Sequence, residues 1–205
     1  MVVISYEVLS HARRLFSEGK SITSWLREEG IELTQELIGM VYELQAGTYS
    51  RIARENTEFV KEFTSEIAAG IKNLPGFGQV STILDCGTGE GTTLLPLVMH
   101  LDFKGNVLAF DGSLSRVSWA KENSRPLDNF KFFAADTSNI PLQDNSIDLV
   151  LSVHSLEPNG GREDELLLEL TRVSSRYVVL VEPDFESSSE LSLIHISEPT
   201  RLLSI

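Results

Sequence analysis

The sequence predicts an α/β fold in which an N-terminal helical cap precedes a doubly wound, mainly parallel sheet. Three observations favour this class. Residues 1–78 carry apolar side chains at helical spacing, residues 79–190 alternate short apolar runs with amphipathic segments, and the first of those runs leads into a glycine-rich turn. Short apolar runs that alternate with helix-length segments are typical of parallel strands buried on both faces.

Length, charge and composition narrow the class further. The 205 residues suit one such domain with a helical appendage, and the net charge of −13 without a long basic run disfavours nucleic acid as a partner. No apolar run reaches the roughly 18 to 20 residues of a membrane-spanning helix, and no secretory signal is evident. A single cysteine excludes an internal disulfide and a multi-cysteine metal site. We therefore expect a cytoplasmic protein with a small-molecule partner, no metal and no membrane association.

Within the cap, residues 1–78, the apolar residues indicate four helices. Their apolar positions run from Tyr6 to Phe16, Ile22 to Leu26, Leu37 to Leu44 and Ile52 to Ile67. Ser21 and Thr34 are suited to cap the second and third helices, because their hydroxyls can accept a main-chain N–H. Gly47 interrupts the chain before the fourth helix, and the segment 75–78, Pro-Gly-Phe-Gly, is a linker.

The second part of the chain is predicted to form five strands and three crossover helices. The strands are expected at 80–84, 106–110, 130–134, 147–153 and 177–181, and the helices at 92–101, 115–124 and 163–173. Pro96 is compatible with the first of these helices only in its first turn or at a kink. An antiparallel C-terminal hairpin is expected to be missing, which would leave the strand at 177–181 as an exposed apolar edge.

The last residues have a different character. Leu191–Arg201 resembles, over eleven consecutive residues, the translation of a transposase-type sequencing adaptor. We therefore expect the genuine sequence to end near Glu190, so that 79–190 is an incomplete domain and 191–205 a non-native tail. His195 and its neighbours are excluded from the functional argument for this reason.

The stretch Asp85-Cys86-Gly87-Thr88-Gly89-Glu90-Gly91 joins the first strand to the first crossover helix. Glycine lacks a Cβ, so a ligand can approach such a turn closely. A dinucleotide loop spaces its glycines as G-x-G-x-x-G, but here Thr92 holds the third glycine position. The spacing thus favours a nucleotide ligand without a pyrophosphate. The alternative is a tight strand-to-helix turn that binds nothing.

Two further acids follow the next two strands. Asp111, before Gly112, ends the second strand, and Asp136, before Thr137, follows the third. The carboxyl ends of parallel strands meet at one edge, where open α/β sheets bind ligands. Asp111 is placed to accept hydrogen bonds from ribose hydroxyls, and Asp136 from an adenine amino group with Ile140 against the ring. The alternatives are a helix cap and a loop carboxylate.

Residues 80 to 185 resemble a class I S-adenosylmethionine-dependent methyltransferase with a Rossmann-like fold, of the ubiquinone/menaquinone-biosynthesis type. The resemblance rests on the glycine stretch, on Asp111, on Asp136 before Ile140-Pro141, and on the run Asn145–Val150. It implies methyl transfer from S-adenosylmethionine to a small-molecule acceptor. It also implies a cofactor site in which Asp111 and Gly112 hold the ribose, and Asp136 and Thr137 the adenine. The methionine part is expected to bind Asp85, Cys86, Gly87, Thr88, Gly89 and Gly91. Cys86 departs from the usual pattern and is expected to pack.

Two alternatives stay open beside this function: a nicotinamide-dependent oxidoreductase, and a fragment that binds the cofactor without turnover. His154, after the fourth strand, is the candidate general base, with a loop histidine that contacts backbone or cofactor as the alternative. Tyr49, at the break in the cap, is placed to close over the cofactor or to pack at the interface. Glu157 and Asn159 are expected to cap the following turn, and Glu182-Pro183-Asp184 to face the substrate.

Overall fold

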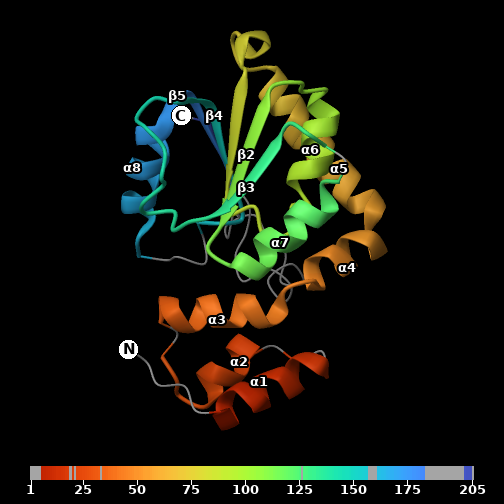
Figure 1. Cartoon of the computed structure of the whole chain (residues 1–205), viewed down its shortest axis with the longest axis vertical. Helices are drawn as coiled ribbons and strands as arrows, with labels where there is room; N and C mark the ends of the chain where they lie inside the picture. The colour runs from red at the N-terminus through yellow and green to blue at the C-terminus, as the bar shows by residue number, and fades with distance from the viewer. Residues whose placement is uncertain are drawn as a thin grey trace.

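The computed structural model describes residues 6–18, 20, 22–32, 34–125, 127–156, 161–182 and 201–204. Its centre is one sheet in the order β3-β2-β1-β4-β5-β6, drawn in Figure 1. Strands β1 to β5 are parallel, and β6 is antiparallel to β5. The strands are β1 Thr82–Cys86, β2 Asn106–Asp111, β3 Phe130–Ala134, β4 Ile147–Val153, β5 Ser174–Glu182 and β6 Arg201–Ser204. The doubly wound sheet predicted from the sequence is confirmed.

Helices cover the sheet on both faces and form the cap. They are α1 Tyr6–Ser17, α2 Ile22–Glu28, α3 Gln35–Gln45, α4 Thr48–Glu55, α5 Thr57–Lys72, α6 Leu94–Leu101, α7 Leu114–Asn123 and α8 Glu163–Val173, with a 3₁₀ turn at Phe77–Gln79. Helices α5 and α6 share a hydrophobic cluster on one face of the sheet, and α8 belongs to a cluster on the other. Figure 1 shows α8 and the α5–α6 pair on opposite sides.

Burial on both faces explains why the strands read as unbroken apolar runs. Ile83 and Leu84 of β1 point to opposite faces, yet both are almost fully buried. Ile83 joins Leu149 and the helices α5 and α6, whereas Leu84 joins Val150 and α8. Because both faces of such a strand are apolar, the strand is buried on both sides, and its apolar composition is enough to predict this.

The order of the sheet reverses between β1 and β4. At such a switch point the connections leave in opposite directions and open a crevice at the carboxyl ends of the strands, where α/β proteins bind ligands. The glycine stretch after β1 and the segment after β4 lie at this point. The predicted site residues therefore fall on the edge that the topology favours.

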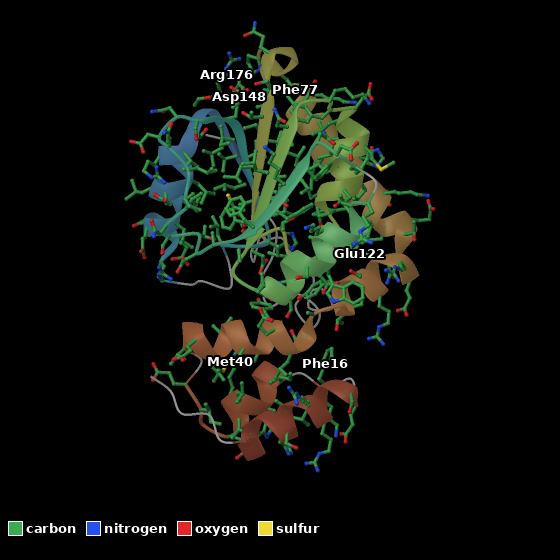
Figure 2. All side chains as sticks on the ribbon, in the orientation of Figure 1. Phe16, Met40, Phe77, Glu122, Asp148 and Arg176 are labelled. Carbon is green, nitrogen blue, oxygen red and sulfur yellow. The ribbon has the colours of Figure 1, made fainter. Side chains whose placement is uncertain are left out.

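Helices α1, α2 and α3 form their own hydrophobic cluster beyond the carboxyl edge of the sheet. Its buried members are Ala12, Ile22, Leu26, Leu37 and Val41. Figure 2 shows Phe16 and Met40 of this part at the opposite end of the molecule from Asp148 and Arg176. The cap therefore lies on the side of the candidate site.

The predicted start of the third helix is confirmed, and the predicted fourth helix is wrong in one respect. The Thr34 hydroxyl accepts the Leu37 N–H at 3.3 Å, as an N-cap does. The segment expected as one helix is split at Asn56 into α4 and α5. Asn56 donates both its main-chain N–H and its side-chain amide to the Ile52 carbonyl, at 3.0 and 2.9 Å, which ends α4 there. Ser21 lies outside the described residues.

Two boundaries also differ at β1 and α6. Strand β1 begins at Thr82 because the preceding 3₁₀ turn is closed by a hydrogen bond from the Val80 N–H to the Phe77 carbonyl at 2.9 Å. Helix α6 begins at Leu94, two residues later than expected, since Gly91 to Thr93 belong to the glycine turn. Pro96 falls in the first turn of α6, as predicted.

Asp148, in the run that resembles the methyltransferase family, is a structural acid at the opposite edge from the site. Its Oδ2 accepts the N–H and hydroxyl of Ser81, at 2.8 and 2.7 Å, and the N–H of Thr82 at 3.1 Å. Burial acts to raise the pKa of Asp148, but these hydrogen bonds outweigh it and lower the pKa to about 2. The carboxylate ties the start of β4 to the start of β1.

The expectation that β5 is an exposed edge is wrong where β6 pairs with it. Arg201–Ser204 runs antiparallel to Val179–Glu182. Strand pairing uses main-chain groups and needs no particular side chains, so any extended segment can satisfy such an edge. The assignment of 191–205 as a non-native tail stays a prediction, and Pro183, Asp184, Glu190 and His195 lie outside the described residues.

Candidate functional site

The turn between β1 and α6 has the backbone shape that the glycine spacing predicted. Gly87, Gly89 and Gly91 all have positive φ angles, of 73°, 56° and 72°. The Thr88 N–H donates to the Phe110 carbonyl of β2 at 2.8 Å, and the Gly91 N–H donates to the Thr88 carbonyl at 3.0 Å. The turn is thus fixed to the end of the neighbouring strand.

The three glycines are needed for different reasons. A Cβ on Gly87 would lie 2.3 Å from the Cβ of Ser155, and one on Gly91 would lie 3.4 Å from that of Ala120 on α7. Glycine at position 87 therefore allows Ser155 to pack on the turn, whereas the contact at Gly91 would be an ordinary one and its positive φ is what favours glycine there. A Cβ on Gly89 would instead meet Nη2 of Arg116 at 2.5 Å, the far end of a flexible side chain. Of the three glycines, Gly89 is therefore the one covered by a group, the Arg116 guanidinium, that a ligand can displace.

Asp111, at the end of β2, is joined directly to the glycine turn. Its buried carboxylate accepts the Gly89 N–H at Oδ2 and the Ser113 N–H at Oδ1, both at 2.9 Å. The side-chain cap of α7 is Ser113, whose hydroxyl accepts the Arg116 N–H at 3.2 Å. A carboxylate has about four acceptor positions, so Asp111 keeps capacity for further donors. A Cβ at Gly112 would make only an ordinary contact, at 3.9 Å from the Ala135 carbonyl.

Asp85, the last-but-one residue of β1, is a buried acid whose pKa is strongly raised. Burial raises the pKa of Asp85 to about 7; the Thr88 side chain lowers it somewhat, and the charge of Asp111 raises it further. The Thr88 Oγ1 is buried and has no partner within hydrogen-bonding geometry among the described residues. This acid and this hydroxyl are polar groups held out of water beside the glycine turn, which is typical of a binding site.

The side chain of Cys86 does not contribute to this site. It is fully buried in the cluster that contains Leu84 and Phe110. Burial raises the pKa of its thiol well above the usual range, so the thiol stays protonated and inert. Only its carbonyl takes part in the turn, by accepting the Ser155 hydroxyl at 2.8 Å. The predicted cofactor contact of Cys86 is thus restricted to its main chain, and the prediction that its side chain packs is confirmed.

Arg116 was missed by the sequence analysis. Its guanidinium lies 4.9 Å from the ring centroid of Tyr42 and 4.8 Å from that of Tyr49, and its Nη1 lies 3.8 Å from Oδ2 of Asp111. Two aromatic faces and one carboxylate hold the cation over Gly89. Tyr49 therefore reaches the glycine turn through Arg116, and its expected closure over the cofactor stays a prediction. The sequence feature that could have indicated its role is the position of Arg116 in the first turn of α7, just after Asp111.

Glu90 was also missed as a site residue. It stands between two glycines of the turn, is almost fully buried, and accepts main-chain N–H groups from the start of α4. The sequence feature that could have indicated its role is an acidic residue surrounded by small residues. Its partners lie about 40 residues earlier in the chain, so the sequence did not reveal them.

The acid after β3 is exposed at the same edge. Oδ1 of Asp136 accepts the N–H and the hydroxyl of Ser138, both at 2.8 Å, and these bonds lower the pKa of Asp136 despite partial burial. Thr137 is half-buried beside it. Ile140 is 2% exposed and belongs to the core cluster with Leu84 and Phe110, so the expected contact of Ile140 with an adenine ring is not supported.

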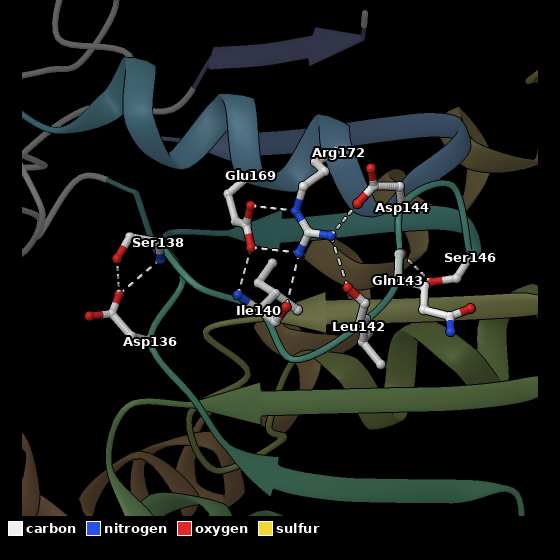
Figure 3. Close-up of polar contacts among 9 residues, drawn as sticks. All are labelled: Asp136, Ser138, Ile140, Leu142, Gln143, Asp144, Ser146, Glu169 and Arg172. Atoms are coloured by element: carbon white, nitrogen blue, oxygen red, sulfur yellow. Dashed lines mark hydrogen bonds and ion pairs between the residues drawn. The ribbon is translucent and has the colours of Figure 1, made fainter.

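The segment that follows Asp136 is held by Arg172 and Glu169 of α8 (Figure 3). Arg172 donates to the carbonyls of Ile140 and Leu142, both at 2.9 Å, and pairs with Glu169 at 2.7 Å and Asp144 at 2.6 Å. Glu169 in turn accepts the Ile140 N–H at 2.7 Å. No helix lies between β3 and β4. Arg172 and Glu169 therefore satisfy main-chain groups of this connection that would be hydrogen-bonded within a helix.

Arg172→Met is expected to lower the free energy of unfolding by about 1–3 kcal/mol, because two carbonyls and two carboxylates lose a charged donor. The Glu169 pKa is lowered chiefly by Arg172, so this stabilisation is present above the ordinary glutamate pKa of 4.5 and is lost as the pH falls below it. Urea unfolding at pH 7 and pH 3.5 measures both effects. Arg125→Met, which breaks only an exposed pair with Glu122, is the control and should change stability by less than about 0.5 kcal/mol. Equal effects of the two variants would contradict the role of Arg172.

His154, the predicted base, is turned toward α5. Its main chain has a φ of 52° and donates to the Val181 carbonyl at 2.8 Å, and its ring contacts Phe63 edge-on with centroids 5.8 Å apart. The next residue, Ser155, is the one that faces the glycine turn. The geometry favours the alternative that His154 is a loop histidine.

Glu182, at the end of β5, organises the segment after β4. Its Oε1 accepts the Ser152 hydroxyl at 3.1 Å and the N–H groups of Ser155 and Leu156, both at 3.2 Å. This contrasts with the expectation that the end of β5 faces the substrate. Glu157 and Asn159 lie outside the described residues.

Among the described residues, no helix is long and apolar enough to cross a membrane. The same part of the chain contains no group of three or more metal-ligating side chains. The cytoplasmic location stays a prediction.

A sheet of this order, with a glycine turn after β1 and acids after β2 and β3, has the fold of class I S-adenosylmethionine-dependent methyltransferases. Residues 83–175 match the family model described as a methyltransferase domain. The cofactor of this class is S-adenosylmethionine. Two observations fit that cofactor: Gly89 is covered by the far end of the Arg116 side chain, which can move, and Asp111 beside it has acceptor capacity left.

Relatives agree with this class. A malonyl-[acyl-carrier protein] O-methyltransferase from a Marinomonas species is 30% identical over 120 residues, which are 58% of this chain and 44% of that protein. This chain therefore spans less than half the length of that curated relative. A putative S-adenosyl-L-methionine-dependent methyltransferase of Methanococcus maripaludis is 21% identical with a TM-score of 0.60, over 75% of this chain and 71% of that one. A putative methyltransferase in a complex with the Haloferax volcanii Trm112 methyltransferase activator is 23% identical with a TM-score of 0.57, over 78% of this chain and 69% of that one. At these identities the two structures show the fold.

Proposed function

We propose that this chain transfers a methyl group from S-adenosylmethionine to a small-molecule acceptor. The observation that carries the proposal is the hydrogen bond between the Asp111 carboxylate and the Gly89 N–H at the switch point of the sheet. This hydrogen bond supports the proposal because it keeps a carboxylate, which can accept hydrogen bonds from ribose hydroxyls, beside the glycine that a ligand can approach. The cap at 1–78 and the domain at 79–190 are the proposed functional units.

The other polar groups of the edge have roles that follow from their chemistry. Asp85 and Thr88 lie beside the turn and suit the ammonium and other polar groups of the methionine part. Asp136 is exposed with one oxygen engaged by Ser138, so its second oxygen is able to accept an adenine amino group. Gly87 and Gly91 shape the turn and make no ligand contact of their own in this proposal.

The bound cofactor supplies a methyl group already activated by the positive charge of its sulfonium. The protein then has to hold the acceptor in line and keep water away, and positioning of this kind accounts for much of the rate. The ring of His154 packs on Phe63 and is turned away from the glycine turn. A carboxylate acceptor fits this arrangement because it is ionised at neutral pH and needs no deprotonation. The O-methylation named for the Marinomonas relative is consistent with an oxygen acceptor.

Two measurements test this function. Calorimetry is expected to show binding of S-adenosylhomocysteine and no binding of reduced nicotinamide dinucleotide. A labelled-methyl assay on a panel of small carboxylic acids, with a malonyl thioester included, is expected to give labelled ester. Binding of S-adenosylhomocysteine without transfer to any acceptor in the panel or in a metabolite extract would instead support a cofactor-binding fragment. Binding of nicotinamide alone would support the oxidoreductase.

A further inference from the structure

The carboxylate of Glu90 is inserted into the start of α4. Its Oε1 accepts the Gly47 N–H at 2.8 Å and the Tyr49 N–H at 3.4 Å, and its Oε2 accepts the Ser50 N–H at 2.7 Å and the Ser50 hydroxyl. The residue is 1% exposed, and no Lys or Arg of the described chain forms an ion pair with it. The charge is instead balanced by the free N–H groups and the dipole of a helix N-terminus.

A third segment closes this network. The side-chain amide of Asn123, the last residue of α7, donates to the Ser50 Oγ at 2.9 Å and to the Glu90 carbonyl at 3.0 Å. The glycine turn, α4 of the cap and the end of α7 therefore meet at Glu90. A buried network in which each member has its partners is rigid, and the loss of one member leaves the others unsatisfied.

The same contact places the aromatic side chains of the cap over the turn. Tyr49 lies within the segment that donates to Glu90, and its ring stacks on Arg116 above Gly89. On the other side, Trp119 of α7 packs so closely on Gly47 that a Cβ there would lie 3.0 Å from the indole. The positions of Tyr49 and Arg116 over Gly89 thus depend on the hydrogen bonds between Glu90 and the start of α4.

We propose that Glu90 is a positioning residue that couples the cofactor turn to the cap. Docking of α4 on Glu90 fixes the conformation of the turn that carries Gly89 and so favours binding at Gly89 and Asp111, and binding in turn favours the docked state. Such a coupling is reciprocal, because each event changes the equilibrium of the other by the same factor. The inference rests on the proposed function for the identity of the ligand, whereas the link between Glu90 and α4 rests on the contacts alone.

The experiment compares wild type with Glu90→Gln in two measurements. The first is hydrogen exchange of the Gly47, Tyr49 and Ser50 amides, and the second is the affinity for S-adenosylhomocysteine. In Glu90→Gln an amide group replaces one acceptor oxygen, so these amides are expected to exchange faster and the ligand to bind about tenfold or more weakly. In wild type, saturation with S-adenosylhomocysteine is expected to slow the same amides. Glu55→Gln, an exposed acid at the end of α4, is the matched control and should change neither.

Two further variants separate positioning from a loss of fold. Ser50→Ala removes one donor to Glu90 and the acceptor of Asn123 but leaves the turn unchanged, and Tyr49→Ala removes the ring that Glu90 positions. Both should weaken binding with an unchanged far-UV spectrum. If Glu90→Gln binds S-adenosylhomocysteine as wild type does, the coupling is overturned and the proposed function stands. If wild type itself does not bind S-adenosylhomocysteine, the proposed function is overturned, and faster exchange in Glu90→Gln still supports the link to α4.

Discussion

Gly89→Val is expected to abolish measurable binding of S-adenosylhomocysteine while the protein stays folded. Position 89 has a φ of 56°, where a β-branched residue is strained, and its Cβ would point at Arg116 Nη2 from 2.5 Å. The guanidinium can move aside, but the valine then fills the approach that the ligand needs. We expect the dissociation constant to rise at least about 100-fold, equivalent to about 2.7 kcal/mol of binding free energy.

Gly78→Val is the matched control for this variant. Gly78 has no positive φ, and a Cβ built on it meets no atom within 4 Å, so the same substitution should leave the affinity unchanged. Calorimetric titration measures the affinity of both variants for S-adenosylhomocysteine, and a thermal melt of each measures stability. Together they distinguish a blocked binding site from a loss of folded structure. Full affinity in Gly89→Val would show that the ligand does not approach this glycine.

Asp85→Asn is expected to stabilise the folded protein at alkaline pH. The pKa of Asp85 is raised from 3.8 to about 7, so the folded state holds a proton that the unfolded state releases. Wild-type stability therefore falls as the pH rises from about 4 to about 7, and the full cost is present above pH 7. The asparagine carries no charge to bury, so the variant should gain a few kcal/mol at pH 8, about 1.4 kcal/mol for each unit of the shift.

Urea unfolding of wild type and Asp85→Asn at pH 5 and pH 8 measures this difference. The advantage of the variant should be small at pH 5 and large at pH 8, while its affinity for S-adenosylhomocysteine falls if Asp85 meets the ligand ammonium. Asp128→Asn, an exposed acid, is the control and should shift stability equally little at both pH values. A pH-independent difference for Asp85→Asn would contradict a raised pKa.

The sheet was predictable because its strands are buried on both faces. The bounds expected for β3, β4 and α8 agree with the structure, since apolar runs and turn residues mark these elements locally. The chain segments that carry Asp85, Asp111 and Asp136 were also predictable, because each follows from the end of a parallel strand. Local sequence was sufficient wherever the determining interactions were local.

Contacts that join distant segments could not be predicted from the sequence. Glu90 and Gly47 are 43 positions apart, and Arg116 meets Tyr42 and Tyr49 only after the cap has docked. The orientation of His154 toward Phe63 likewise depends on the packing of α5 on the sheet. No periodicity or motif encodes these pairings, and they are the ones that give the glycine turn its particular neighbours.

A crystal structure of the full chain with S-adenosylhomocysteine tests the central claim most directly. We expect the methionine part to lie beside Asp85, Thr88 and Gly89, the ribose hydroxyls to bond to Asp111, and the adenine to reach Asp136. Arg116 should have moved from its position over Gly89, with α4 still seated on Glu90. Ligand density at any other surface, with the Gly89–Asp111 hydrogen bond and Arg116 unchanged, would contradict the assignment of this site.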